Sequence, residues 1–274
     1  MGEQAVIEGS DRPVTSASLI EDLRSLGVEP GMTLMVHASL SRLGYVAGGA
    51  HAVVLALLES IGRDGTLVMP THSTDLTDPA SWSNPPVPPE WCDAIRNGMP
   101  AYDPALTPTR SMGAIVECFR HVPGVQRSGH PTVSAAAVGP NAGFVTADHR
   151  LHDGLGEHSP QARVYELDGH VVLLGVSHTN NTSLHLAERR SAPENAVHRP
   201  QSSPIAVDGE RRWVSYECLD DDPSDFGTIG DAVASAGLER IGPVGNATGR
   251  LMGSRDLVDF ATAWMKQHRS WPTR

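Results

Sequence analysis

Apolar residues recur along the chain in short runs that alternate between helical spacing and strand length. A run with apolar residues at every third or fourth position predicts a first helix over residues 18–26, opened by a capping box of Ser18 and Glu21. The runs at 33–40 and 65–70 have the length of buried strands, and a helical pattern lies between them. This order predicts a βαβ unit with two parallel strands.

The second half of the chain repeats this mixture of patterns. A strand of small residues is predicted at 134–139, and a hairpin-like turn at 168–169 precedes a fully apolar strand at 171–176. An Asp-Gly pair at 208–209 predicts a second hairpin, and a final helix is predicted from residue 254 to about residue 267. The interleaved strands and helices indicate an α/β fold in a single domain, residues 1–274.

Residues 71–110 break the periodic pattern. The segment is rich in proline and contains Trp82, Trp91 and Tyr102, which are unusual in disordered chains. A loop of this length inside a compact domain is usually functional. Over residues 71–109, five carboxylates against one arginine make it acidic, so we interpret the segment as a substrate flap; the alternative is a disordered insertion.

The sharpest candidate for chemistry follows the apolar strand at 171–176. Asn181 or Thr182 can cap a helix there, which places His185 in its first turn and Glu188 three residues later on the same face. Ligands of open α/β sheets bind at this carboxyl edge. His185 is therefore either a general base or a packing histidine, and Glu188 either orients it or is an ordinary helix acid.

Composition and charge exclude several classes. The chain of 274 residues has a formal net charge of −11, which disfavours binding to nucleic acid. No apolar run reaches the length of a membrane span, and the opening residues do not match a secretion signal, so we expect a cytoplasmic protein. Its one lysine, Lys266, fits neither a phosphate-binding loop nor a pyridoxal enzyme. Cys92, Cys118 and Cys218 form no paired motif, so we expect free thiols.

A metal site and a covalent nucleophile are both disfavoured. His149, His152, His158 and His170 cluster in sequence, but their spacing fits no zinc motif. No serine stands in the turn that a serine hydrolase requires. We therefore expect no metal.

Seven segments in order resemble the aminoglycoside 3-N-acetyltransferases, a family of antibiotic acetyltransferases. They are VHASLSRLG at 36–44, LVMPTHS at 67–73, the segment 91–104 ending in MPAYDP, TPTRSMGAIVECFR at 107–120, RSGHPTVSAAAVG at 127–139, GEHSP at 156–160 and LLGVSHTNNTSLHLAE at 173–188. The resemblance covers residues 18–268. It implies a three-layer α/β/α sandwich, distinct from the common acetyltransferase superfamily, and acetyl transfer from acetyl-CoA to an amine.

The resemblance also implies site residues. The family's catalytic histidine falls on His185, with Glu188 in the same motif, and an acidic residue of the site falls on Asp225. Either carboxylate would orient the imidazole. Coenzyme contacts of the family fall on five residues: His37, Ser39, Leu40, Thr109 and Ser134.

The charges agree with the substrates that the family implies. Aminoglycosides are polycations, and Asp75, Asp103 and Glu157 are the carboxylates that we expect to bind them. The phosphates of acetyl-CoA need cations, for which the available donors are Arg110, Arg120 and Arg127.

The sequence thus predicts an enzyme that acetylates the 3-amino group of aminoglycosides and so confers resistance. Two alternatives are a related N-acyltransferase acting on another amine metabolite and a non-catalytic relative that binds the coenzyme or a polyamine. The expected partners are small molecules, without nucleic acid or membrane and with a possible homodimer. The preferred aminoglycoside is not encoded in any motif.

Overall fold

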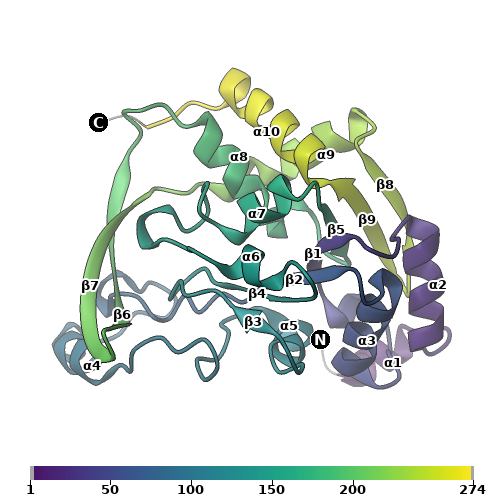
Figure 1. The fold of residues 1–274 in the computed structure, drawn as a ribbon, viewed down its shortest axis with the longest axis horizontal. Helices are drawn as coiled ribbons and strands as arrows, with labels where there is room; N and C mark the ends of the chain where they lie inside the picture. Colours follow the sequence, from purple (N-terminus) through teal and green to yellow (C-terminus); the bar gives the residue numbers. More distant parts are fainter. Residues whose placement is uncertain (1–2, 273–274) are drawn as a thin grey trace.

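The fold is built on a seven-stranded sheet in the order β3-β4-β2-β1-β5-β9-β8 (Figure 1). This is a computed structural model, which describes residues 3–272. The central strand β1 pairs in parallel with β2 and with β5, which confirms the predicted βαβ unit. The strands of this sheet are β1 (Thr33–Ala38), β2 (Thr66–Pro70), β3 (Gln126–Arg127), β4 (Ala135–Val138), β5 (His170–Leu174), β8 (Glu239–Val244) and β9 (Ala247–Gly253).

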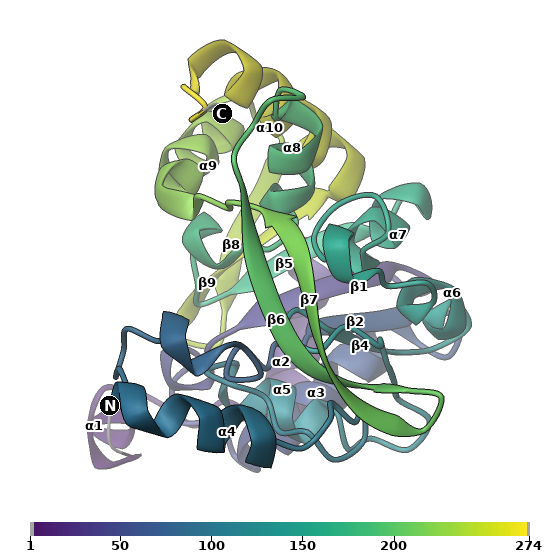
Figure 2. The same cartoon turned by 90° about the vertical axis from the view of Figure 1, so that its left-hand side faces the viewer.

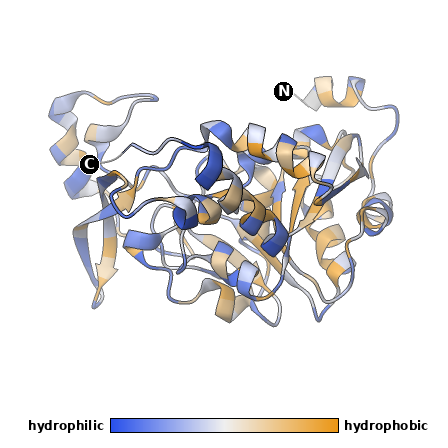
Figure 3. Cartoon of the chain, turned by 90° about the horizontal axis from the view of Figure 1, so that it is seen from above, coloured by the Kyte–Doolittle hydropathy of each residue, from blue (hydrophilic) through white to orange (hydrophobic). Residues whose placement is uncertain are grey.

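Helices cover both faces of this sheet, so the predicted three-layer arrangement is confirmed. Alternate residues of one strand point to opposite faces: Leu34 and Val36 belong to one apolar core, and Met35 belongs to the other. Figure 3 shows the apolar strands enclosed by helices whose outer faces are more polar. One core includes residues of α2 (Ser16–Leu26), α3 (Gly49–Ile61) and α5 (Gly113–Phe119), and the other includes residues of α6 (Ala142–Thr146), α7 (Pro160–Glu166), α8 (Leu184–Ser191), α9 (Phe226–Ser235) and α10 (Ser254–His268).

A long antiparallel hairpin stands beside the main sheet (Figure 2). Its strands β6 (His198–Val207) and β7 (Glu210–Leu219) pair along their whole length, as the Asp-Gly turn predicts. The hairpin holds the long segment 71–110: Tyr102 N–H donates to the Pro204 carbonyl at 2.9 Å, and Arg211 Nε donates to the Met99 carbonyl at 2.6 Å. The segment is therefore ordered, and it contains the helix α4 (Cys92–Gly98).

Several predicted boundaries are wrong for local reasons. Helix α2 begins earlier than predicted, because Thr15 is the capping residue and Ser18, not Glu21, completes the capping box. The turn at 168–169 joins helix α7 to strand β5 and forms no hairpin. The hairpin of β8 and β9 was not predicted, because β8 is mostly solvent-accessible and contains Gly242 and Pro243, two residues that are uncommon within strands.

A short helix, α1 (Glu3–Glu8), precedes the sheet. Within residues 3–272, no helix combines the length and the apolar character that crossing a bilayer requires.

Candidate active site

His185 and Glu188 form a buried pair on helix α8. His185 lies in the first turn, and its Nδ1 is 2.7 Å from Glu188 Oε2, as the spacing of three residues predicts. The Glu188 side chain is fully buried, and 14% of the His185 side chain is exposed. The His185 ring meets the Phe226 ring edge-on, with 4.8 Å between centroids. This packing leaves the imidazole little freedom to rotate.

Several donors keep Glu188 ionised. Burial acts to raise the pKa of Glu188, but hydrogen bonds and charges from His185, the Asp222 N–H and Arg269 outweigh it, so this pKa lies below its usual value. The Asp222 N–H donates to Oε1 at 2.7 Å. An ionised carboxylate only accepts hydrogen bonds, so neutral His185 carries its proton on Nδ1. Its Nε2 then holds the free lone pair, which is what a general base needs.

Asp225 does not orient the imidazole. Its carboxylate lies at the start of α9 and is held by Arg269, whose Nε donates to Oδ2 at 2.8 Å. Arg269 also contacts Glu188, so Asp225 is linked to Glu188 only through the Arg269 guanidinium. Of the two carboxylates that the sequence left open, Glu188 is therefore the partner of His185.

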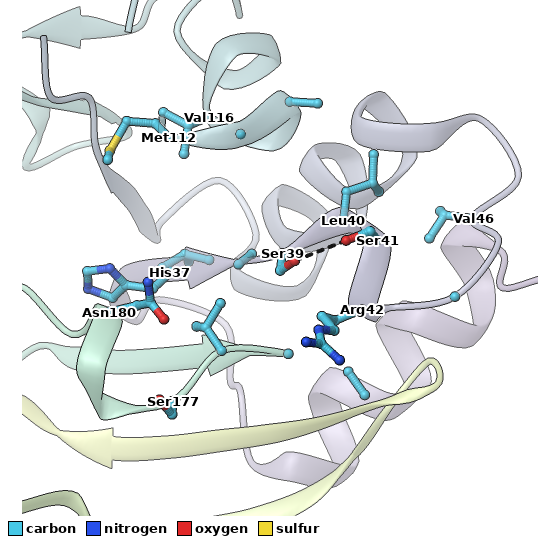
Figure 4. A pocket seen from close by; sticks show the side chains of 18 of the residues that line it. His37, Ser39, Leu40, Ser41, Arg42, Val46, Met112, Val116, Ser177 and Asn180 are labelled. Carbon is cyan, nitrogen blue, oxygen red and sulfur yellow. Dashed lines mark hydrogen bonds between the residues drawn. The ribbon is translucent and has the colours of Figure 1, made fainter. Parts of the chain in front are cut away.

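A cavity of about 1270 Å³ opens where β1, β2 and β5 end. It is larger than the pockets of about 300 to 1,000 Å³ that hold most small ligands. Figure 4 shows His37 and Asn180 at one end of this cavity, and Ser39 and Arg42 further along it. Asn180 and Thr182, from the segment that leads into α8, connect its wall to the helix of His185. Of the five expected coenzyme contacts, the structure places His37, Ser39 and Leu40 in the lining.

The other two expected contacts lie elsewhere. Thr109 Oγ1 donates to Glu117 at 2.7 Å, and Ser134 is fully buried, with its hydroxyl donating to the Thr71 carbonyl. Neither lines the large cavity. Both residues instead stabilise the segments around β2 and α5.

The cations of the cavity also differ from those expected. Arg42 and Arg250 line it, whereas Arg110, Arg120 and Arg127 do not. Arg127 is occupied by hydrogen bonds to backbone and hydroxyl oxygens, among them the Thr71 carbonyl at 2.6 Å. Arg250 is paired with Glu239, while within residues 3–272 Arg42 has no carboxylate partner.

Two buried histidines near the site, His37 and His72, are neutral. Burial and the nearby His178 lower the pKa of His37 to about 3. Burial and the nearby His185 and other charges likewise lower the pKa of His72 to about 3. Within the described chain, Nε2 of both rings is buried without a hydrogen-bond partner. Such atoms carry a desolvation cost unless a ligand or water pairs with them.

The three carboxylates expected to bind substrate are spread over separate surfaces. Glu157 forms a bidentate pair with Arg190 at 2.7 and 3.0 Å, and Asp103 caps the backbone N–H groups of the turn that follows it. Asp75 lies between Thr74 and Thr77, two residues that line a smaller cavity of about 160 Å³.

Asp221 is the carboxylate that the structure adds beside His185. Atoms of His185, Glu188 and Asp221 lie within 4.8 Å of one another. Asp221 also lines the small cavity and pairs with Arg189 at 2.7 Å, with 29% of its side chain exposed. Residues 220, 221, 222 and 225 are all aspartates, and no local sequence pattern distinguishes the one that reaches His185. Because both Glu188 oxygens already accept hydrogen bonds, the trio is a poor metal-ligand set.

Comparison with known proteins gives consistent matches over nearly the whole chain. Residues 35–266 match the family model described as aminoglycoside 3-N-acetyltransferase. The chain is 43% identical over 260 residues to the SPbeta prophage-derived aminoglycoside N(3')-acetyltransferase-like protein YokD of Bacillus subtilis (strain 168), covering 94% of this chain and 95% of that protein. It is 38% identical to aminoglycoside N(3)-acetyltransferase VII of Streptomyces paromomycinus, covering 97% and 96%.

Solved structures agree with these matches. The crystal structure of YokD superimposes with a TM-score of 0.94 at 41% identity, covering 97% of this chain and 98% of that one. A structure described as AAC-IIIb binary with CoASH superimposes with a TM-score of 0.84 at 31% identity, covering 96% and 100%.

Proposed function

Because the chain belongs to the aminoglycoside 3-N-acetyltransferase family, we propose that it transfers the acetyl group of acetyl-CoA to the 3-amino group of an aminoglycoside. The observation that carries the proposal is the His185–Glu188 pair, whose helix begins at the wall of the large cavity. Acetylation replaces an ammonium by a neutral amide, so a polycationic antibiotic loses part of the charge with which it binds its target. Resistance is the expected consequence.

Acetyl-CoA supplies the acyl group as a thioester, which the acceptor amine attacks directly. His185 Nε2 takes the proton that the attacking nitrogen loses as the new C–N bond forms. Glu188 stabilises the resulting imidazolium through Nδ1–H. As the C–S bond breaks, His185 returns that proton to the departing sulfur, so the products are an N-acetylated acceptor and free thiol.

The large cavity is the proposed coenzyme site. Arg42 has no carboxylate partner among the described residues, so it offers a cation for the phosphates of the coenzyme. Figure 4 shows the Arg42 side chain in the cavity lining, near Ser41. Neutral His37 offers a buried, unpartnered Nε2, and Ser39 and Leu40 follow on the same loop. A polar coenzyme would supply the Arg42 guanidinium with an anionic partner and His37 Nε2 with a hydrogen-bond partner.

The acceptor is proposed to approach His185 from the side of Asp221 and the small cavity. Burial raises the pKa of Asp221, although the charges of Arg189 and His185 act against this. A positive ammonium nearby stabilises the ionised carboxylate, so the acceptor and Asp221 would attract each other. Asp75 lies next to the same cavity. Glu157 and Asp103 remain candidates for amines further out.

Thiol release measured with several aminoglycosides and simple polyamines tests the function. Thiol formation with an aminoglycoside, and a product with its acetyl group on the 3-amino nitrogen, would support the proposal. Turnover only with other amines would favour the related N-acyltransferase, and coenzyme binding without turnover would favour a non-catalytic relative. A cytoplasmic location, at the supply of acetyl-CoA, and a homodimer remain predictions.

A further inference from the structure

Arg269 lies just after α10, and its guanidinium joins two carboxylates of the site. Nη1 donates to Glu188 Oε1 at 2.5 Å, and Nε donates to Asp225 Oδ2 at 2.8 Å. Nη2 donates to Asp225 Oδ1 and, at 2.9 Å, to the Asp222 carbonyl. Only 7% of the side chain is exposed, so these charge-assisted hydrogen bonds are shielded from solvent.

These contacts divide the two oxygens of Glu188 between different partners. Oε1 accepts from Arg269 and from the Asp222 N–H, and Oε2 is left for His185. We propose that Arg269 is a positioning residue that fixes the Glu188 carboxylate and offsets its charge, and thereby sets the pH range in which His185 accepts a proton. This proposal rests on the acetyl transfer described above.

Charged or titratable groups face the His185–Glu188 pair from four other segments. Asp221 approaches His185 from the segment after β7, where Arg189 of α8 pairs with it. His72 approaches from the segment after β2, and its low pKa of about 3, caused first by burial, keeps it neutral. Asp225 of α9 reaches Glu188 only through Arg269. Arg269 is thus the cation that contacts the Glu188 carboxylate directly.

The sign of the effect follows from treating His185 and Glu188 as one proton-binding unit. Loss of the nearby positive charge strengthens proton binding to the pair. In either protonated arrangement, His185 Nε2 cannot accept a proton: the ring is an imidazolium, or Nδ1 accepts from a neutral Glu188 while Nε2 carries the proton. The acid-side midpoint of kcat/KM should therefore move to higher pH when Arg269 loses its charge.

The segment after α10 has anchors besides the guanidinium. The Val197 N–H donates to the Pro272 carbonyl at 3.2 Å, and the Arg269 N–H donates to the Met265 carbonyl at 2.9 Å. Because both bonds use backbone atoms, a substitution at Arg269 leaves them available. The tail can therefore keep its path while the charge is changed.

The test is the pH profile of kcat/KM for Arg269→Gln against the unchanged enzyme, with one acceptor so that the acceptor's own ionisation cancels. We expect the acid-side midpoint to rise by about one pH unit. Arg269→Lys keeps the positive charge, so its acid-side midpoint should lie close to that of the unchanged enzyme. Asp225→Asn removes the negative charge on the other side of Arg269 and should move the midpoint to lower pH.

A second readout does not depend on turnover. The ring signals of His185, assigned by comparison with His185→Gln, are titrated by NMR in the enzyme alone, and their midpoint should rise in Arg269→Gln. Arg255→Gln, at the far end of α10, is the matched control and should leave both midpoints unchanged. Lower activity with unmoved midpoints would show that Arg269 only anchors the tail. If the unchanged enzyme transfers no acetyl group, the NMR titration alone decides.

Discussion

The chemistry of single residues in this site depends on which atoms are already occupied. His185 uses Nδ1 to hold Glu188, so only Nε2 is left to accept a proton. His72 and His37 are kept neutral by burial, so they offer hydrogen bonds but no positive charge that would repel an ammonium. The surroundings of His185 therefore combine the ionised Glu188 with buried histidines that carry no charge.

Replacing the proposed base gives the most direct residue-level prediction. His185→Ala should lower kcat by about 10² to 10⁴, the usual contribution of a general base. Because the helix and the large cavity remain, the affinity for coenzyme A measured by calorimetry should change little. His198→Gln, at an exposed ring on β6, is the matched control. A kcat near that of the unchanged enzyme would remove His185 from the mechanism.

A second residue-level prediction is that no acetyl-enzyme forms. Burial raises the pKa of the Cys218 thiol to about 11, and Cys92 is buried as well. A thiol must ionise to act as a nucleophile. Incubation with acetyl-CoA alone should therefore leave the intact mass of the protein unchanged, and a stable gain of one acetyl group on the protein would contradict direct transfer.

Asp221 supplies a prediction about the acceptor. Asp221→Asn should raise the aminoglycoside KM several-fold, since an ammonium loses a partly buried counter-charge, and should leave the acetyl-CoA KM unchanged. Glu157→Gln should raise it less, because 54% of the Glu157 side chain is exposed against 29% for Asp221, so solvent screens its charge more strongly. Steady-state kinetics with both substrates varied decides this. Equal effects of the two substitutions would move the acceptor site outward to the Glu157 surface.

At the scale of elements, sequence patterns predicted the place of His185 and Glu188 but not the arginines around them. The position of His185 was predictable because a buried strand and a helix lie within one short stretch. The predicted cap was wrong: Ser183, and neither Asn181 nor Thr182, directly precedes the helix, and no side chain caps it.

Arg269 was not predictable, because it meets Asp225 and Glu188 across 44 and 81 residues and no local pattern encodes such a contact. Arg42 was missed for another reason: its short helix follows the predicted strand at the cavity edge, where a single arginine carries no motif.

The hairpin and the long segment 71–110 should loosen together. Arg211→Ala removes the donors to the Met99 and Arg96 carbonyls and should raise cleavage within residues 71–110 about five-fold, for a loss of about 1 kcal/mol. Limited proteolysis with mass mapping measures this. Arg212→Ala is the control, because Arg212 makes only a 3.8 Å contact with Glu210 at the exposed tip. Equal cleavage in both variants would show that Arg211 does not hold the segment.

At the scale of the whole molecule, buried neutral histidines should make stability depend on pH. Burial lowers the pKa of His37, His72 and His130 to about 3 and that of His149 to about 4, from an ordinary value of 6.5. The unfolded chain therefore binds more protons below about pH 6.5, and each ring costs up to about 1.4 kcal/mol of stability per pH unit as the pH falls toward its folded pKa.

Urea unfolding at about pH 7, 6 and 5 measures this loss, and the unfolding free energy should fall at each step. His149→Gln, which retains an amide able to hydrogen-bond, should reduce the slope. A free energy independent of pH over this range would mean that the folded protein binds protons as readily as the unfolded chain, so that these rings are not kept neutral by burial.

The position of Arg269 along the chain also orders events during synthesis. Translation produces Glu188 and Asp225 before the guanidinium that joins them. Until that residue leaves the ribosome, the growing chain must keep these carboxylates hydrated, because burying them without a counter-charge is costly. We therefore expect the packing of α8 against α9 and α10 to be completed only after Arg269 has emerged.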